Sequence, residues 1–121
     1  MMIQRGIRGA ISVEENTEEL ITLNTKILLE KIIEENKIDL DNIVSVIFSA
    51  TKDLSKIYPA KVARDLGFSS VPLMCLQEMH VEYSLKKCIR VLITINCEKD
   101  FKIKHIYLKK AAKLRPDITQ L

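Results

Sequence analysis

The sequence predicts an α+β fold in which a mixed five-stranded sheet packs with one long helix and one or two short helices. Several segments rich in β-branched residues alternate between apolar and polar positions, as strands do, and they outnumber the helical segments. One long segment, residues 17–36, instead repeats its apolar residues at helical spacing. A chain of 121 residues buries one core but not two, so we expect a single domain over residues 1–121.

The first strand is expected over residues 2–13, and the long helix follows it. Strand alternation places Arg5 among isoleucines on one face and Arg8 beside small or polar residues on the other. Asn16 and Glu19 have the spacing of a capping box that opens the helix. The predicted core stripe of the helix comprises Leu20, Ile21, Leu23, Ile27, Leu28 and Ile32, whereas Leu29 and Ile33 fall outside it and need another surface to cover them.

The rest of the chain predicts short elements. A second strand is expected over residues 42–50, and a short helix then has Pro59 near its first turn and Gly67 as its stop. The remaining predicted elements are strands over residues 71–76, 86–96 and 102–108, and a turn or short helix over residues 109–117 that Pro116 limits.

Composition describes a compact globular protein, because 47% of the residues are hydrophobic, 29% are charged, and only three are glycine and three proline. The N-terminal residues lack the apolar run of a signal peptide, and no segment approaches the roughly 20 apolar residues that span a bilayer, so we expect a cytoplasmic protein with no membrane partner. Three cysteines without C-x-x-C spacing favour buried or site-lining thiols over disulfides or a metal site.

Common catalytic and nucleotide-binding patterns are missing from the sequence. It contains neither a G-x-S-x-G elbow nor a phosphate-binding glycine loop, and His80 and His105 have no patterned serine or cysteine partner. The basic tract from Lys99 to Arg115 contains two aromatic residues and is one candidate nucleic-acid surface. We disfavour that partner, because the net charge is only +3 and no known binding motif accompanies the tract.

Arg90 is the most informative charged residue, because it interrupts a strand whose two faces are otherwise mostly apolar. A buried guanidinium without a partner costs free energy, so Arg90 needs an anionic or polar partner. An internal ion pair with Glu78, Glu82 or Glu98 satisfies that need, and so does an anionic ligand. Cys75 and Glu78 offer a thiol and a carboxylate that share one pocket only if the strand ends between them.

Six fragments, RGIRGA, PAKVAR, CLQEM, KKCIRV, HIYL and LRPD, resemble in this order the AroH class of chorismate mutases across nearly the whole chain. The resemblance implies a pseudo α/β-barrel homotrimer with sheets at its centre and active sites between subunits. It also implies the Claisen rearrangement of chorismate to prephenate in phenylalanine and tyrosine biosynthesis. That reaction proceeds by conformational positioning and electrostatic stabilisation, without a metal, a cofactor or a covalent intermediate.

The resemblance further implies roles for individual residues. Arg90 matches the donor to the ether oxygen, Arg8 and Tyr107 match the pair that holds a carboxylate, and Glu78 with Cys75 matches the ring-side pair. Gly6 and Gly9 are expected to give the ligand room beside Arg8. Residues matching further binding positions are Tyr58 (where the family has phenylalanine), Ala60, Lys61 and Arg64 from the adjoining subunit, and Leu114 and Arg115 from the C-terminal segment. The alternative is a non-catalytic trimer that binds a small dicarboxylate.

Overall fold

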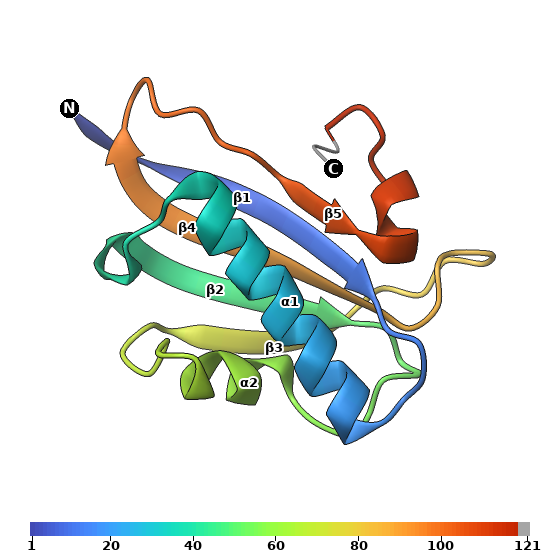
Figure 1. Ribbon diagram of the computed structural model, residues 1–121. Helices are drawn as coiled ribbons and strands as arrows, with labels where there is room; N and C mark the ends of the chain where they lie inside the picture. The colour runs from blue at the N-terminus through green and yellow to red at the C-terminus, as the bar shows by residue number, and fades with distance from the viewer. Residues whose placement is uncertain (119–121) are drawn as a thin grey trace.

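The computed structural model describes residues 1–118 and contains a mixed five-stranded sheet of order β3-β2-β4-β1-β5 (Figure 1). The predicted α+β class is therefore confirmed. The β1–β4 and β2–β4 pairs are antiparallel, whereas β2–β3 and β1–β5 are parallel. The strands are β1 (Met2–Ser12), β2 (Ile43–Ala50), β3 (Leu73–Gln77), β4 (Cys88–Glu98) and β5 (Ile106–Leu108), and the helices are α1 (Glu18–Asn36), α2 (Pro59–Asp65) and two 3-10 turns, η1 (Leu40–Asn42) and η2 (Lys109–Lys113).

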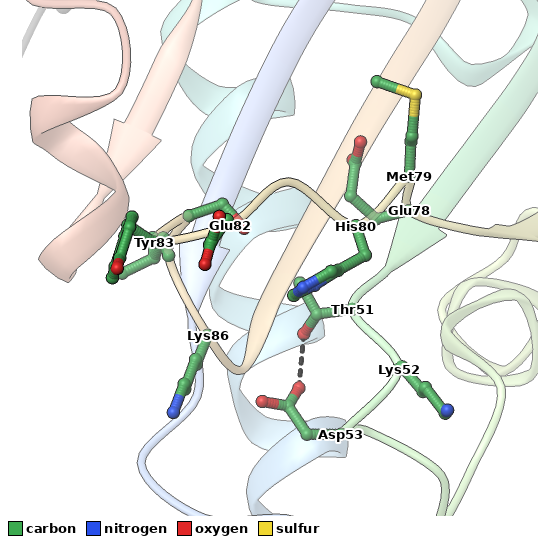
Figure 2. Close-up of a pocket in the computed structure, with 11 residues that line it drawn as sticks. Thr51, Lys52, Asp53, Glu78, Met79, His80, Glu82, Tyr83 and Lys86 are labelled. Carbon is green, nitrogen blue, oxygen red and sulfur yellow. Dashed lines mark hydrogen bonds between the residues drawn. The ribbon is translucent and has the colours of Figure 1, made fainter.

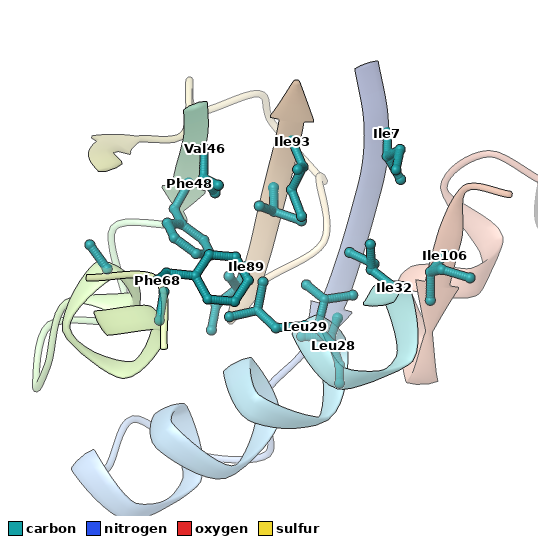
Figure 3. Packing of buried hydrophobic residues seen from close by; sticks show 14 of the residues in the cluster. Ile7, Leu28, Leu29, Ile32, Val46, Phe48, Phe68, Ile89, Ile93 and Ile106 are labelled. Carbon is teal, nitrogen blue, oxygen red and sulfur yellow. The ribbon is translucent and has the colours of Figure 1, made fainter. Parts of the chain in front are cut away.

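Both α-helices cover one face of the sheet, and the main core lies between them and that face (Figures 1 and 3). The other face carries no helix over β2 and β3, and several large apolar side chains there are exposed. They are Ile47, Met74, Leu76 and Leu92. All three cysteines are free, and Cys88 and Cys97 are buried, as predicted. Within residues 1–118 no helix combines the length and apolar character needed to cross a bilayer.

The start of α1 differs from the prediction. Thr17, not Asn16, is the N-cap, and its hydroxyl accepts a hydrogen bond of 3.1 Å from the Leu20 amide. The Asn16 side chain instead forms two hydrogen bonds with Ser55 in the connection after β2. This tertiary contact uses the side chain that the sequence predicted to cap the helix. Both residue types cap helices well, and the sequence alone did not separate them.

The predicted core stripe of α1 was also partly wrong. Leu29 is fully buried in the main core of this chain, whereas Leu23 is 49% exposed. Because the sheet and α2 both contact α1, the helix buries a wider arc than a single sheet face would cover. The intrachain core therefore covers Leu29, which needs no second subunit to bury it.

Strand boundaries shifted where the backbone leaves the extended region. The strand predicted over residues 86–96 is Cys88–Glu98, because Lys87 has φ 47 and its N–H donates to Asp53 in the connection after β2. The strand predicted over residues 71–76 begins after Pro72, at Leu73. Only Ile106–Leu108 of the predicted residues 102–108 pairs with β1. Gly67, at φ 108, ends α2 as expected.

Gly9 serves packing on the helix side of the sheet. A Cβ atom at Gly9 would lie 2.7 Å from Ile32 Cδ1 and 3.1 Å from Val91 Cγ1. The missing side chain lets α1 approach β1 and β4 closely. Gly9 also lines a cavity together with Arg8, so the expectation that it leaves room for a ligand stays a prediction. Gly6 is on the opposite face, where a Cβ atom would lie 3.1 Å from Leu92 Cδ1.

Candidate active site

Three adjacent strands bring the predicted cationic residues to the open face of the sheet. Ala10 of β1 pairs with Arg90 of β4 on one side and with Tyr107 of β5 on the other. Arg8 lies two positions from Ala10 and so points to the same face. Arg8, Arg90 and Tyr107 line a cavity of about 330 Å³, together with Arg115, which follows η2. Strand alternation and register, rather than closeness in sequence, therefore assemble this group.

Arg90 is held on one side by Glu78. Its Nε atom lies 3.3 Å from Glu78 Oε1, and the two side chains are 41% and 29% exposed. The Nε atom is buried and has no hydrogen-bond partner among the described residues, so the contact is an ion pair without hydrogen-bond geometry. Within residues 1–118, the two terminal nitrogens of Arg90 form no hydrogen bond with a carboxylate, and the closest contact of the guanidinium with a carboxylate is through Nε. The internal ion pair and the anionic ligand are therefore compatible, because they engage different nitrogens.

Glu78 follows β3 and is fixed from β2. The hydroxyl of Ser49 donates a hydrogen bond of 2.7 Å to Glu78 Oε1, and the Glu78 amide donates to the Ala50 carbonyl at 2.9 Å. Ser49 pairs with Arg90 across β2 and β4, so all three side chains meet on the open face. Sequence reasoning missed Ser49. The alternation of β2 places it on the face of Ile47, but only the register with β4 brings it to Arg90.

A larger hollow of about 690 Å³ lies beside Glu78, between the connections that follow β2 and β3 (Figure 2). Three carboxylates line it, those of Asp53, Glu78 and Glu82, against two lysines, Lys52 and Lys86, and no arginine. The lining therefore has no excess of positive charge for an anionic ligand. The smaller cavity, with Arg8, Arg90 and Arg115 in its wall, is the site suited to a molecule with two carboxylates.

The positive charge around the cavity also acts on His105. The Arg8 amide donates to His105 Nδ1 at 2.9 Å, so this nitrogen accepts and the ring is neutral. Burial lowers the pKa of His105, and the charges of Arg8, Arg115 and Arg5 lower it further. Arg5 itself lies on the helix side of β1, away from the cavity, and its Nη1 donates to the Phe101 carbonyl at 2.6 Å.

Arg115 and Leu114 approach the cavity from the C-terminal segment. Arg115 forms two contacts with Asp117, Nε–Oδ1 at 3.0 Å and Nη2–Oδ2 at 2.8 Å. This hydrogen bonding raises the pKa of Arg115 and lowers that of Asp117. Leu114 packs on a small buried cluster that contains Ala10, Cys88, Tyr107 and Ala111. Burial raises the pKa of Cys88 to about 11, so the thiol beside Arg90 is neutral at physiological pH.

The remaining predicted residues gather elsewhere on the chain. Tyr58, Lys61 and Cys75 line a separate hollow of about 590 Å³ beside α2. Ala60 is buried under this region, and Arg64 lies on the exposed side of α2. Cys75 belongs to the helix-side packing, and burial raises the pKa of its thiol. Since β3 runs on to Gln77, Cys75 and Glu78 do not share a pocket within one chain.

Comparison with known proteins places this architecture in a family. The sequence profile described as chorismate mutase type I matches residues 4–118. The chain belongs to the type I chorismate mutase family. Chorismate mutase AroH of Bacillus subtilis (strain 168) is 50% identical over 120 residues, which cover 98% of this chain and 94% of that protein.

Two further relatives agree with this assignment. Chorismate mutase AroH of Thermus thermophilus is 44% identical over 116 residues, covering 94% of this chain and 95% of that protein. The solved structure of a chorismate mutase from Clostridium thermocellum superposes with a TM-score of 0.85 at 46% identity, covering 88% of this chain and 96% of that chain. The chorismate mutase resemblance read from the six sequence fragments is thus confirmed.

Proposed function

We propose that this protein is a chorismate mutase that converts chorismate to prephenate in aromatic amino-acid biosynthesis. The observation that carries the proposal is the cavity on the open sheet face, where Arg8, Arg90 and Arg115 converge in a chain of this family. Chorismate has two carboxylates, and a wall with three guanidinium groups suits such an anion. Residues 1–121 are taken as one catalytic domain.

The rearrangement is intramolecular, so the protein has two tasks. It must hold the enolpyruvyl chain over the ring in a compact conformation, and it must stabilise the negative charge that develops on the ether oxygen as the C–O bond breaks. Arg8 and Tyr107 are assigned to the first task, as the pair that binds a carboxylate. Tyr107 pairs with Ala10, and Arg8 lies two positions before Ala10 on the same strand, so the two side chains are neighbours on one face of the sheet. This arrangement supports the assignment.

Arg90 is assigned to the second task. Glu78 pairs with its Nε atom and Ser49 in turn donates to Glu78, so the guanidinium is oriented before substrate binds. Its terminal nitrogens are then available to the ether oxygen and a neighbouring carboxylate. Such a preorganised donor stabilises the transition state more than the ground state. Glu78 has a second oxygen that accepts from the substrate hydroxyl.

A homotrimer completes this site in our proposal. Tyr58, Lys61, Arg64 and Cys75 lie near α2, on a different part of the chain from Arg90, so a second copy must supply them to the cavity. Exposed apolar side chains on the open face, Ile47, Met74, Leu76 and Leu92, form a surface that association would bury. The cytoplasmic location expected from the sequence stays a prediction.

The test is direct. Purified protein is incubated with chorismate, and the loss of chorismate absorbance and the appearance of prephenate are followed. We expect acceleration well above the uncatalysed rate. Isothermal titration with chorismate under the same conditions separates the rival: binding without turnover would indicate the non-catalytic dicarboxylate binder, and neither binding nor turnover by the folded protein would refute both.

A further inference from the structure

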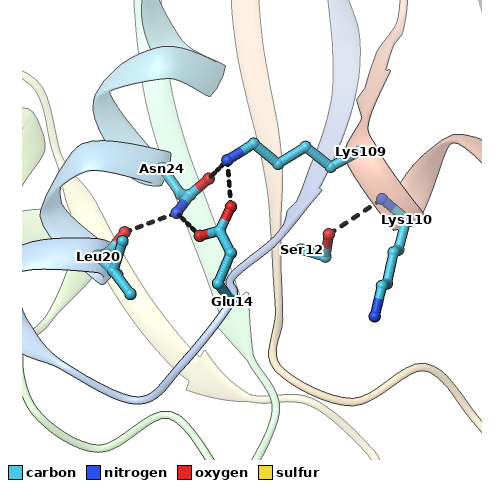
Figure 4. A network of polar contacts seen from close by, with 6 residues as sticks. All are labelled: Ser12, Glu14, Leu20, Asn24, Lys109 and Lys110. Atoms are coloured by element: carbon cyan, nitrogen blue, oxygen red, sulfur yellow. Dashed lines mark hydrogen bonds and ion pairs between the residues drawn. The ribbon is translucent and has the colours of Figure 1, made fainter.

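A ring of polar side chains lies where the C-terminal segment meets the start of α1 (Figure 4). Lys109 Nζ donates to Glu14 Oε2 at 2.6 Å and to Asn24 Oδ1 at 2.5 Å. Asn24 Nδ2 donates to Glu14 Oε1 at 2.9 Å and to the Leu20 carbonyl at 2.8 Å. Three side chains thus close a ring, and Asn24 within it is fully buried with its oxygen and nitrogen both satisfied.

The backbone of Lys109 is itself unusual. Its φ of 55 lies in the left-handed region, where a residue with a side chain is disfavoured. Such a conformation persists only when the surrounding contacts hold it. Here the ammonium is held by Glu14 and Asn24, and the next amide, of Lys110, donates to the Ser12 hydroxyl at 3.0 Å.

This turn sets the direction of the residues that reach the cavity. Tyr107 lies two residues before Lys109, and Leu114 and Arg115 follow it through η2 (Lys109–Lys113). The ladder that fixes β5 to β1 has only three pairs, Gly9 with Ile106, Ala10 with Tyr107, and Ile11 with Leu108. Beyond them, hydrogen bonds to Ser12 and Glu14 continue the attachment, and Ala111 and Leu114 add apolar packing against Ala10.

We propose that Lys109 is a positioning residue: its ammonium, held by Glu14 and Asn24, fixes the left-handed turn that directs the segment with Leu114 and Arg115 toward the cavity. This inference rests on the proposed chorismate mutase function for its catalytic consequence. Its structural consequence, the anchoring of residues 110–115, is independent of that function.

The electrostatics agree with a persistent ring. Hydrogen bonding from Lys109 is the largest cause that lowers the pKa of Glu14 to about 2, and Asn24 contributes next. Glu14 is therefore ionised at neutral pH and Lys109 keeps its anionic partner. Because the Glu14 side chain is 51% exposed, salt screens this pair, and the buried Asn24 must supply part of the rigidity.

The main variant is Lys109→Met, which keeps the apolar stem but removes the ammonium. Lys113→Met is the matched control, since it removes an equal charge from the same 3-10 turn, where Lys113 is exposed. We expect Lys109→Met to raise KM for chorismate on the order of tenfold while kcat changes much less, because Arg115, which follows the turn, is assigned to binding. Lys109→Arg, which keeps the charge, should restore part of the affinity.

A second measurement does not depend on catalysis. Trypsin cleavage after Lys110 and Lys113 is followed by mass spectrometry on folded protein, and Lys110 cleavage should be several-fold faster in Lys109→Met than in Lys113→Met. If Lys109→Met does not fold, Glu14→Gln replaces it, with Glu15→Gln as its control. Equal KM and equal cleavage in variant and control would overturn the proposal. Wild-type protein without mutase activity would refute the proposed function, while the cleavage comparison still tests the anchoring.

Discussion

Arg90 shows how one residue is prepared for electrostatic work. Its neighbours along β4, Ile89 and Val91, are buried in the core on the helix side, while Arg90 reaches the open face. The partly buried surroundings strengthen any charge interaction that it makes. Glu78 compensates part of the positive charge and orients the side chain through its Nε atom. A lysine at this position has a single nitrogen and could not meet both demands.

Replacing Arg90 by lysine should therefore lower kcat on the order of 10² to 10³-fold, the usual effect of losing one preorganised donor to a developing negative charge. Steady-state kinetics with chorismate measures the change, and circular dichroism checks that the variant folds. Arg5→Lys is the matched control: Arg5 lies on the other face of the sheet and contacts a backbone carbonyl, so its kcat should stay near that of the wild type. A normal kcat in Arg90→Lys would remove the assigned role.

At the level of elements, the sequence identified what depends on local periodicity. The alternation of β1 separated Arg5 from Arg8, the helical spacing located α1, and Gly67 marked the end of α2. What it missed depends on partners distant in the chain. Thr17 rather than Asn16 caps α1, because the Asn16 side chain is bound to Ser55. Leu29, predicted to lie outside the core stripe, is buried in the core of this chain.

The candidate site follows the same division. The six motifs supplied the residue types, because they match a family, but not which residues meet within one chain. Ser49 reaches Glu78 and Arg90 only through the register of β2 with β4, and the ring around Lys109 joins residues 95 positions apart. Pairing across a sheet is non-local, so neither contact leaves a pattern in a short stretch of sequence.

The close approach of α1 to the sheet gives a prediction about Gly9. Gly9→Ala should destabilise the fold by about 1 to 3 kcal/mol, because the new Cβ atom overlaps Ile32 Cδ1 in a closely packed core. Urea unfolding measures the free energy. Ile32→Val removes the Cδ1 atom and by itself costs about 0.5 to 1.5 kcal/mol. The double variant should lose less stability than the sum of the two single variants.

The overlap with Val91 Cγ1 and the Ile106 carbonyl means that this rescue should be partial. Gly6→Ala is the control on the open face, where one leucine side chain has room to shift. It should change the free energy of unfolding less than Gly9→Ala. If the losses of stability were additive in the double variant, overlap with Ile32 Cδ1 would not be the reason that an alanine is destabilising at position 9.

On the scale of the whole molecule, the proposed site residues fall into two separate groups within the chain. One lies on the open face around Arg90, and the other lies beside α2 around Lys61 and Cys75. Cys75 and Glu78 are three residues apart yet belong to different groups, because the pleat of β3 turns them to opposite faces. A cyclic assembly in which the open face of one copy meets the α2 region of the next would join the groups at every interface.

This assembly predicts recovery of activity between two impaired variants. Arg90→Ala disables the first group, and Arg64→Glu places a negative charge at the second, so each variant alone should have little activity. When the two are unfolded together in equal amounts and refolded, a site works only if an intact Arg90 group meets an intact Arg64 group. Random mixing gives about one quarter of sites intact in a closed ring. Mixing the folded variants without unfolding is the control, since slow subunit exchange should leave them inactive.

Activity of the refolded mixture that never exceeds the average of the separate variants would mean that both groups act from the same chain. Light scattering on the mixture would show whether a trimer had formed.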